Sequence, residues 1–433
     1  MQKLKILLIG SGGRESAIAI AIQKQINKQK PDASVFIEDF FVAPGNPQIA
    51  SFAKCIKINL SNELIVDFCK QNHINLVIVG PEDPLANGIC DALQKAGIKA
   101  FGPSAAAAKL ESSKIFMKDF CVKYNIPTAK YKTFTSQNTT EEVLSFATQI
   151  GYPIVLKTDG LAAGKGVVIC EDEGIFCKNL EEYFSGKFGK ASKSIVVEEF
   201  LTGKEVSFFA LSDGKNFKTF FYACDHKKLL DNNRGPNTGG MGTYSFKSIL
   251  NEASIKEAEN LVIKPLVGGM LELDTPYKGV IFAGLMLTQK GIRLIEYNVR
   301  FGDPETQAML PLLQNDITDI FLAVTDGTLD KLELKFSDDA CVNVVCVSGG
   351  YPDAYKKDIL IKGLQNIETS QAEVIHCGTA LNAKGELVTA GGRVLSIRAV
   401  ANSITQARAK VYNQIEKIEF EGCYYRKDIA KNL

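Results

Sequence analysis

The chain contains no tryptophan and only three histidines, and its cysteines form no CxxC pair. This scarcity excludes a zinc site of the usual ligand spacing. The eleven scattered cysteines indicate buried or surface thiols in a reducing compartment. Basic residues show no excess, since 50 lysines and arginines stand against 49 acidic residues. That balance argues against a nucleic-acid partner.

Long apolar runs are also missing. The sequence has no stretch of about 18 apolar residues, and its first residues enter a strand pattern rather than an export segment. We therefore expect a cytoplasmic protein with no membrane partner. Its length predicts roughly two to four domains, and no repeat or low-complexity segment interrupts them.

The stretch 291–305, GIRLIEYNVRFGDPE, combines a strand pattern with an unusual charge content. A period of two predicts that one strand face carries Ile292, Leu294, Glu296, Asn298 and Arg300. Alternate strand residues lie roughly 6.6 Å apart, so a carboxylate and an amide oxygen can converge on one hard cation. An edge strand with a solvated polar face would also explain this pattern. The turn and the two further carboxylates in 301–305 favour a magnesium phosphate site.

Near the N-terminus, an apolar strand at 5–9 stops at GSGGRE (10–15) and passes into a helix. Glycines and a helix N-terminus offer backbone amides to a phosphate, and Arg14 adds positive charge. Glu15 stands where a dinucleotide fingerprint requires glycine, which favours a mononucleotide or sugar phosphate.

Further turns follow the apolar strands at 76–79 and 100–101, and 42–46 reads VAPGN. Ligands of open parallel sheets bind beyond the carboxyl ends of strands, where all these turns are expected to lie. Ordinary strand termination would explain any single turn, but the full set favours a ligand crevice.

A second glycine-rich segment, DGLAAGKG (159–166), lies between a strand at 153–157 and another at 167–169. It does not match a P-loop, which requires a different glycine–lysine spacing and a following helix. We expect a mobile flap whose amides and Lys165 fold over phosphates, while Lys157 contacts them from the strand. Before it, one helix after Ser104 is expected to carry Ser113 and Lys114.

The next strand, 194–197, leads to Glu198, and Glu205 follows after a turn. These carboxylates could accept hydrogen bonds from ribose hydroxyls or belong to a solvated hairpin, and the residues alone leave both open. Four glycines in 235–242 predict an irregular, flexible loop beside charged residues. From about residue 332 strands and turns dominate, and a helix is expected from Ser403.

Six motifs together resemble the phosphoribosylamine–glycine ligase family of the ATP-grasp superfamily, over nearly the whole chain. They are GSGGRE at 10, VGPEDPL at 79, LKTDGLAAGKGVV at 156, GPNTGGMG at 235, EYNVRFGDPETQ at 296 and YRKDI at 425. The resemblance implies an α/β fold with an N-terminal open parallel sheet and a two-part ATP-grasp core with a small lid. The expected units are 1–106 (substrate-binding domain), 107–124 (start of the core), 125–192 (lid), 193–330 (core with metal and ATP site) and 331–433 (C-terminal α/β domain).

The resemblance also implies the site residues. A Mg²⁺ or Mn²⁺ ion is expected on Glu296 and Asn298, and the reacting groups on Asp225, Lys227 and Arg300. The expected contacts of the co-substrate ATP are Lys114, Lys157, Gly164, Lys165, Gly166, Glu198, Leu201 and Glu205. The expected contacts of the other substrates are Gly12, Gly13, Arg14, Glu15, Asn46, Glu82, Asn237, Thr238, Gly239 and Arg393.

The activity implied is ligation of glycine to 5-phosphoribosylamine through glycyl phosphate, in purine biosynthesis, by a monomer or weak homodimer. Another ATP-grasp carboxylate–amine ligase, a carboxylating enzyme and a non-catalytic nucleotide sensor are the alternatives. Departures from the family pattern are Ser16 for histidine, Phe246 for proline and Ala430 for glycine. Phe282 and Gly284 also stand where many ATP-grasp enzymes carry a further acidic metal ligand.

Overall fold

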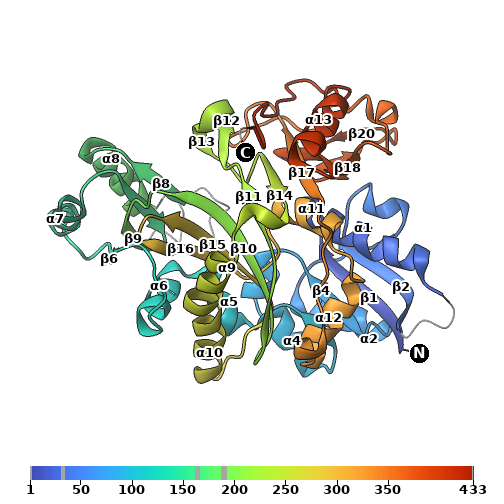
Figure 1. The fold of residues 1–433 in the computed structure, drawn as a ribbon, viewed down its shortest axis with the longest axis horizontal. Coiled ribbons are helices and arrows are strands. Elements are labelled where there is room, and N and C mark those ends of the chain that lie inside the picture. The colour runs from blue at the N-terminus through green and yellow to red at the C-terminus, as the bar shows by residue number, and fades with distance from the viewer. Residues whose placement is uncertain (1, 31–34, 161–165, 187–192, 432) are drawn as a thin grey trace.

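The protein is described by a computed structural model that covers residues 2–30, 35–160, 166–186, 193–431 and 433. An N-terminal sheet lies at one end of the molecule and a small antiparallel sheet at the other, with a longer sheet between them (Figure 1). Within the described ranges, no helix combines the length and apolar character that a membrane crossing requires.

The N-terminal unit is a five-stranded sheet in the order β3-β2-β1-β4-β5, and every neighbouring pair is parallel. Its strands are β1 (Gln2–Gly10), β2 (Val35–Pro44), β3 (Lys54–Cys55), β4 (Leu76–Val79) and β5 (Lys99–Phe101). Its helices are α1 (Gly13–Lys28), α2 (Asn62–Gln71), α3 (Glu82–Ala86), α4 (Ile89–Lys95) and α5 (Ala105–Ser112), with a 3₁₀ turn at Ile49–Ser51.

The register of this sheet aligns the ends of its central strands. Gly10 lies opposite Pro44, and Ile9 lies opposite Val79, so the turns after β1, β2 and β4 share one edge. This confirms the expected open parallel sheet with its glycine turns at the carboxyl edge. β1 is flanked by β2 and β4, so the chain reverses its direction of winding there, which is where such sheets bind ligands.

The lid is a four-stranded antiparallel sheet in the order β6-β9-β7-β8. Its elements are β6 (Tyr131–Thr135), α7 (Thr140–Ile150), β7 (Ile154–Thr158), β8 (Val167–Cys170), α8 (Glu173–Phe184) and β9 (Ser194–Glu199). It has a hydrophobic core of its own, built around Phe134, Leu156, Phe176 and Tyr183. A separate core makes the lid a structural unit of its own.

The longest sheet has eight strands in the order β16-β15-β10-β11-β14-β17-β21-β18. Its strands are β10 (Lys204–Asp213), β11 (Phe217–Asp225), β14 (Gly242–Ser245), β15 (Lys278–Thr288), β16 (Gly291–Asn298), β17 (Ala340–Val347), β18 (Glu373–His376) and β21 (Arg393–Ala401). β14 pairs with β17, so the C-terminal strands extend the sheet that begins with β16. The boundary expected at residue 331 therefore falls between strands of one continuous sheet.

Helices and two hairpins complete the fold. The helices are α6 (Lys114–Lys123), α9 (Glu252–Ala258), a π turn (Glu259–Ile263), α10 (Lys264–Glu272), α11 (Glu305–Met309), α12 (Ile317–Asp326) and α13 (Ile404–Ile415). The hairpins are β12–β13 (Lys228–Leu230, Arg234–Asn237) and β19–β20 (Thr379–Leu381, Leu387–Thr389). Ser403 caps α13 through its side chain, as its sequence position predicted.

Two local expectations are corrected. The single helix expected to carry Ser113 and Lys114 is two helices, because Ser113 leaves the helical conformation and caps α6. The glycine-rich segment 235–242 is not wholly irregular, because its first residues belong to β13 and its last residue begins β14. Neighbouring strands supply partners for the glycine backbone, which a local pattern could not show.

The third correction concerns β16, which carries a bulge. Leu294 pairs with Leu285 and Glu296 with Gly284, so Ile295 is an extra residue against β15. A one-residue bulge reverses the alternation of faces beyond it. Ile292 and Leu294 therefore share the buried core with Tyr297 and Val299, and the expected common face with Glu296, Asn298 and Arg300 was wrong.

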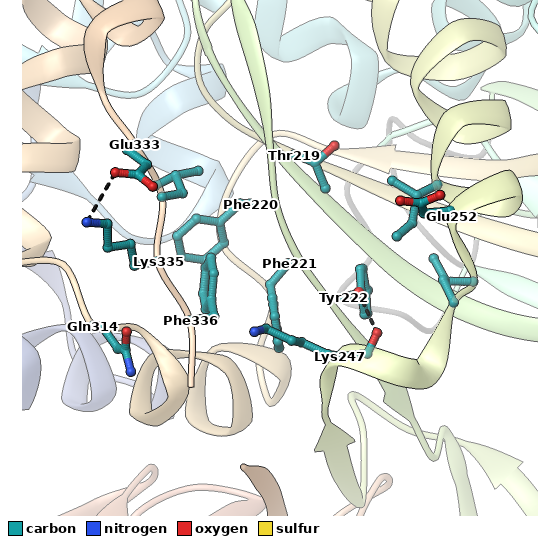
Figure 2. A pocket seen from close by; sticks show the side chains of 13 residues that line it. Thr219, Phe220, Phe221, Tyr222, Lys247, Glu252, Gln314, Glu333, Lys335 and Phe336 are labelled. Atoms are coloured by element: carbon teal, nitrogen blue, oxygen red, sulfur yellow. Dashed lines mark hydrogen bonds and ion pairs between the residues drawn. The ribbon is translucent and has the colours of Figure 1, made fainter. Parts of the chain in front are cut away.

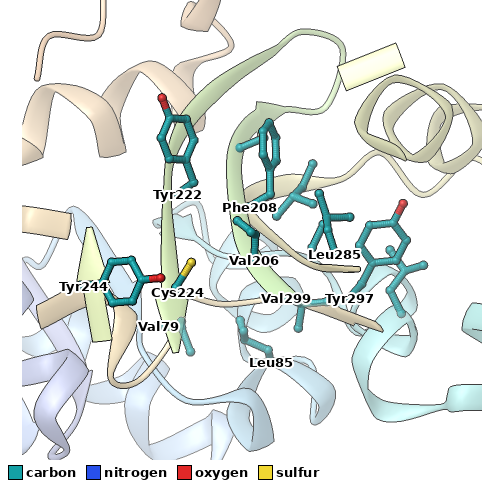
Figure 3. Close-up of a cluster of buried hydrophobic side chains, with 14 of the residues drawn as sticks. Val79, Leu85, Val206, Phe208, Tyr222, Cys224, Tyr244, Leu285, Tyr297 and Val299 are labelled. Atoms are coloured by element: carbon teal, nitrogen blue, oxygen red, sulfur yellow. The ribbon is translucent and has the colours of Figure 1, made fainter. Parts of the chain in front are cut away.

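That core joins the N-terminal unit to the long sheet. Figure 3 shows Val79 and Leu85 of the N-terminal unit in one cluster with Val206 and Phe208 of β10 and Tyr297 of β16. Because apolar burial stabilises the fold in proportion to the area removed from water, this cluster fixes the carboxyl edge of the first sheet against the polar end of β16.

Candidate active site

Two lysines and one glutamate form a buried ionic group between the lid and α6. Glu198 is 2% exposed and Lys118 is fully buried. Lys118 Nζ lies 2.9 Å from Glu198 Oε2, and Lys157 Nζ lies 3.0 Å from Glu198 Oε1. The Lys157 contact does not have hydrogen-bond geometry, so charge attraction holds it. Glu198 therefore fixes Lys157 at the end of β7.

Lys114 lies in the first turn of α6, close enough to add to the positive field at Glu296. The Ser113 hydroxyl donates to Asp159 Oδ1 at 3.1 Å, and the Ile115 amide donates to the same oxygen at 3.2 Å. These bonds tie the start of α6 to the end of β7. Gly164 and Lys165 lie outside the described residues. Gly166 is buried, and its carbonyl accepts the Thr158 amide at 2.9 Å.

Leu201 and Glu205 flank the turn between β9 and β10, where the sequence located them. Leu201 is half-buried, whereas Glu205 is exposed and forms a close ion pair with Lys227. Lys227 lies two residues after the end of β11. This contact connects the beginning of β10 with the segment that precedes hairpin β12–β13.

Glu296 and Asn298 supply the oxygen donors for a cation at the end of β16. Burial alone would raise the pKa of Glu296, but Lys227, Lys114 and Lys157 outweigh it and lower the pKa to about 2. An ionised carboxylate two residues from an amide oxygen suits a hard divalent cation. Gly284 and Phe282 lie opposite them and add no carboxylate.

The donor set is small, since the described part of the chain contains no group of three or more His, Cys, Asp or Glu able to hold a metal. A Mg²⁺-type ion commonly accepts one or two carboxylates and completes its shell with water and substrate phosphates. The residues present fit such an ion when a nucleotide shares it.

Arg300 joins β16 to the N-terminal unit. Its Nε lies 3.1 Å from Glu82 Oε2, and its Nη2 lies 3.0 Å from Glu111 Oε1. Nη2 also donates to Asn298 Oδ1 at 3.2 Å. Although burial opposes it, the carboxylates of Glu111 and Glu82 raise the pKa of Arg300 above its ordinary value. The guanidinium is thus held at the junction of the two sheets.

Asp225, at the end of β11, carries a buried carboxylate oxygen without a hydrogen-bond partner among the described residues. Burial, with the nearby charge of Glu305, raises the pKa of Asp225 well above its ordinary value. Glu305 Oε1 accepts the Ser207 hydroxyl at 3.0 Å. Gly240, at φ +112°, packs against Asp225 and Pro304, and a side chain there would clash with both.

The N-terminus of α1 differs from its expected role as an open anion site. The Gly12 amide donates to Glu15 Oε2 at 2.7 Å, and the Arg14 amide donates to Asp303 Oδ2 at 3.4 Å. The Arg14 side chain is also occupied, with Nε 2.6 Å from Glu15 Oε1 and Nη1 donating to the Phe301 carbonyl. The protein's own carboxylates thus take the dipole position that a phosphate was expected to fill.

Most of the remaining predicted residues lie near the N-terminus of α1 and Asp303. Arg393 Nη1 donates to the carbonyls of Gly239 at 2.5 Å and Asp303 at 2.7 Å. The Gly239 amide donates to the Tyr351 hydroxyl at 2.9 Å. Thr238 is held on the Lys227 carbonyl, and Asn237 pairs with Lys228. Gly13 packs against Gln307 and Cys377, where a side chain would clash.

Asn46 belongs to a small hydrogen-bonded group at the same sheet edge. Its Nδ2 donates to the Ser11 carbonyl at 2.8 Å and to Ser16 Oγ at 2.7 Å. Ser16 donates in turn to the His376 carbonyl at 2.7 Å. The departure at Ser16 is therefore accommodated by a direct bond to the C-terminal strands.

Sequence reasoning missed several residues of this site. Local sequence shows Asp303 and Glu305 only as charges in a turn, and no local feature distinguishes Lys118, Glu111 or Tyr351. Nothing in a local pattern separates Lys118 from a solvated helix lysine. The only available signal was the phase of α6, which puts Lys118 one turn after Lys114.

A large cavity lies away from these residues. It has a volume of about 670 Å³ and opens beside β11, where Figure 2 shows Phe220, Phe221 and Phe336 among charged side chains. None of the predicted site residues lines it. Volume alone therefore does not locate the chemistry of this protein.

A small antiparallel lid beside a larger antiparallel sheet, with lysines and an ionised glutamate at their junction, defines an ATP-grasp enzyme. Models of phosphoribosylglycinamide synthetase match the N domain at 4–111, the ATP-grasp (A) domain at 112–306 and the C domain at 341–432. The chain belongs to the phosphoribosylamine–glycine ligase family. It is an enzyme that uses ATP and a divalent metal.

Individual relatives agree with this assignment. Phosphoribosylamine–glycine ligase of Agrobacterium fabrum is 44% identical over 428 residues, 99% of this chain and 98% of the relative. The ligase of Caldanaerobacter subterraneus subsp. tengcongensis is 44% identical over 430 residues, 99% of both chains. The crystal structure of the Thermotoga maritima ligase superposes with a TM-score of 0.81 at 30% identity, covering 98% of this chain and 100% of that one.

A protein with a different activity has a similar fold. The biotin carboxylase domain of Hydrogenobacter thermophilus 2-oxoglutarate carboxylase, solved with MgADP, ADP and bicarbonate, superposes with a TM-score of 0.70 at 18% identity. It covers 98% of this chain and 92% of that one. At this identity the likeness concerns the fold alone.

Proposed function

We propose that this protein joins glycine to 5-phosphoribosylamine, converting ATP to ADP and phosphate and forming glycinamide ribonucleotide for purine biosynthesis. The observation that carries the proposal is the arrangement around β16. Glu296, ionised among three lysines, lies near the end of β16, and Asp225, with one buried oxygen that has no hydrogen-bond partner among the described residues, lies at the end of β11. Full-length identity to named ligases supports the substrate assignment.

In the first proposed step, a glycine carboxylate oxygen attacks the γ-phosphorus of ATP and ADP leaves. Lys157 and Lys114 hold the phosphates, Lys157 being fixed by Glu198. Mg²⁺ or Mn²⁺ on Glu296 and Asn298 would neutralise charge on the transferred phosphoryl group. Leu201 and Glu205 flank the adenosine. The product of this step is glycyl phosphate.

In the second step, the amine nitrogen of phosphoribosylamine attacks the acyl carbon, and phosphate leaves with both electrons of the broken C–O bond. The nitrogen must lose one proton. We assign that proton to the Asp225 carboxylate, because its raised pKa makes it a better base than an ordinary aspartate. Arg300, held by Glu82 and Glu111, offers positive charge to the departing phosphate.

The sugar phosphate is proposed to bind between the glycine turns of the first sheet and Arg393. Gly12, Gly13, Arg14, Glu15, Asn46, Glu82, Asn237, Thr238 and Gly239 surround this space. Because Glu15 and Asp303 already accept the amides of α1, we assign to Arg14 and Glu15 the shaping of the turn rather than direct phosphate binding. We assign the phosphate to Arg393, which would exchange its present bonds to Gly239 and Asp303 for the substrate.

An oxygen-label experiment tests the route. Glycine labelled with ¹⁸O in both carboxylate positions is converted with ATP and phosphoribosylamine, and the products are analysed by mass spectrometry. One label should appear in the amide and the other in inorganic phosphate. A simple ATPase takes its phosphate oxygen from water and would leave phosphate unlabelled. Label retained wholly in the glycine-derived product would refute the acyl phosphate, and absence of turnover would favour a sensor.

A further inference from the structure

The C-terminal motif YRKDI (425–429) lies outside the chemistry described above, although it contains the largest fully buried side chain of the described residues. Arg426 is 1% exposed and belongs to no helix or strand. A buried guanidinium requires partners for its charge and donors. The identity of these partners indicates what the motif does.

Arg426 bonds both to its own segment and to hairpin β12–β13. Within the motif, Nε lies 2.7 Å from Asp428 Oδ1, and Nη2 lies 2.8 Å from Asp428 Oδ2. Across to the hairpin, Nη1 donates to the Lys228 carbonyl at 2.9 Å, and Nη2 donates to Asn233 Oδ1 at 3.1 Å. A planar guanidinium in a bidentate pair has little freedom to rotate.

Backbone amides add two further bonds between the hairpin and the motif. The Asn232 amide donates to Asp428 Oδ2 at 2.8 Å, and the Lys427 amide donates to Asp231 Oδ1 at 2.8 Å. Asn232 and Asn233 have φ of 59° and 53°, a left-handed turn that asparagine tolerates. Both ends of the hairpin turn are thus fixed to residues 426–428.

The hairpin leads directly into the reacting side of the site. Lys227 precedes it, and the Lys227 carbonyl accepts the Thr238 amide at 2.8 Å and the Thr238 hydroxyl at 2.7 Å beyond its other end. Gly239 is fixed by Tyr351 and Arg393, and Gly240 packs on Asp225. Lys227 and Thr238 thus join the two ends of the hairpin at its base, and the short strands β12 and β13 connect them to the tip held by residues 426–428.

We propose that Arg426 and Asp428 are positioning residues for the amine side of the reaction, acting through hairpin β12–β13 on Lys227 and Thr238. The inference rests on the proposed function for its kinetic consequence. Residues Arg426 and Asp428 touch no reacting atom in this assignment. Their task is to keep a short hairpin, whose tip is exposed, in one position.

The C-terminal segment has anchors that do not depend on the Arg426 side chain. The Tyr412 hydroxyl donates to the Arg426 carbonyl at 2.7 Å, and Arg408 donates to the carbonyls of Ile429 at 3.0 Å and Lys427 at 2.6 Å. Replacing the Arg426 side chain should therefore loosen the hairpin while the segment stays bound.

The test compares Arg426→Met and Asn233→Gly with Arg426→Lys and Lys427→Ala. Asn233→Gly removes only the hairpin's side-chain acceptor and keeps the left-handed backbone available. Lys427 is exposed, so Lys427→Ala is a control at the neighbouring position. Hydrogen exchange of the amides in 228–242 is measured by mass spectrometry on each full-length variant, followed by steady-state kinetics.

We expect Arg426→Met to speed exchange in 228–242 by about tenfold or more, while exchange in the lid is unchanged. Its kcat/KM for phosphoribosylamine should fall by about 100-fold, the scale of a 1 Å misplacement. Its affinity for ATP should fall by clearly less, because Lys227 acts on that side only through Glu205 and Glu296. Asn233→Gly should give a smaller change of the same kind, Arg426→Lys partial recovery, and Lys427→Ala none.

Unchanged exchange in 228–242, or an equal loss of ATP affinity, would overturn the positioning role. Exchange does not depend on turnover. If the unmodified protein fails to form glycinamide ribonucleotide, the proposed function fails, and the exchange data still decide whether Arg426 holds the hairpin. If Arg426→Met does not fold, Asn233→Gly supplies the same comparison.

Discussion

The two sides of the site treat buried charge in opposite ways. On the phosphate side, both oxygens of Glu198 contact lysines, Lys118 at 2.9 Å and Lys157 at 3.0 Å. On the amine side, Asp225 has a buried oxygen with no hydrogen-bond partner among the described residues, and Glu305 lies close enough to repel it. On the first side two lysines outnumber one glutamate, whereas the second side disfavours the charged form of its carboxyl group.

This difference matches the two kinds of chemistry proposed for the site. Binding phosphates requires permanent positive charge in fixed positions, which a buried ionic group provides before ATP arrives. Accepting a proton requires a group whose pKa lies closer to neutrality, which burial beside another carboxylate provides. Substitutions on each side should therefore have separable effects.

Glu296→Gln should have the largest effect, because it removes the single carboxylate charge assigned to the metal. We expect kcat to fall by about 1,000-fold, the upper range for losing one electrostatic contact in a closed site. The fold should persist, as checked by circular dichroism. Glu421→Gln, at a residue whose side chain is 76% exposed, is the control. Full activity of Glu296→Gln at ordinary magnesium concentrations would remove Glu296 from the site.

Asp225→Asn should reduce kcat by about 100-fold, within the usual range for a lost general base, while the Kd for ATP is retained. Rates of the unmodified protein should rise with pH as Asp225 loses its proton, and the variant should lack this rise. An equal loss of ATP affinity would contradict the separation of the two sides.

Stability gives a second measurement for Asp225. The pKa of Asp225 in the folded protein is raised above the unfolded value of about 4. The neutral carboxyl group of Asp225 therefore contributes its full stabilisation below about pH 4. It is lost as pH increases through the folded pKa. The Tm of Asp225→Asn, measured by thermal unfolding, should therefore fall less with rising pH than the Tm of the unmodified protein. If the Tm of both proteins fell equally with pH, burial would not raise the pKa of Asp225.

Lys118→Met should have the smallest effect on rate and the clearest effect on stability. Removing one partner of a buried ion pair costs about 3–5 kcal/mol, because Glu198 keeps its charge without full compensation. We expect a lower Tm and a KM for ATP about tenfold higher, since Glu198 loses its bond to Lys118 and no longer fixes the position of Lys157. The KM values for glycine and the amine should hold. Adding Glu198→Gln should restore part of the stability, and failure to do so would exclude the pair as the cause.

The backbone conformation at Ala430 could be predicted from the local sequence motif. Ala430 follows RKDI, where the family pattern has glycine, and its φ is 55°, a conformation that favours glycine. The family motif therefore indicates a left-handed backbone at this position, which the alanine itself does not indicate. The strand and turn expectations for the first sheet succeeded for the same reason, since apolar runs that end at glycine are local features.

The bulge in β16 marks the limit of that reasoning. A period of two assigned Glu296 and Leu294 to one face, but pairing with β15 inserts Ile295 and separates them. Nothing in 291–299 signals the extra residue, because the register belongs to two strands together. The spacing between Glu296 and Asn298 lies beyond the bulge and was unaffected.

Short-range features follow from local sequence: the strands, the glycine turns, the capped helices and the motifs that indicate the family. Which charges are paired follows from contacts between distant segments. Lys118 and Glu198 are 80 residues apart, and Arg300 and Glu82 are 218 apart. A carboxylate at the end of a strand can bind a ligand, cap a helix or neutralise a lysine. The choice depends on which distant groups share its low-dielectric surroundings, because burial penalises every charge left without a partner.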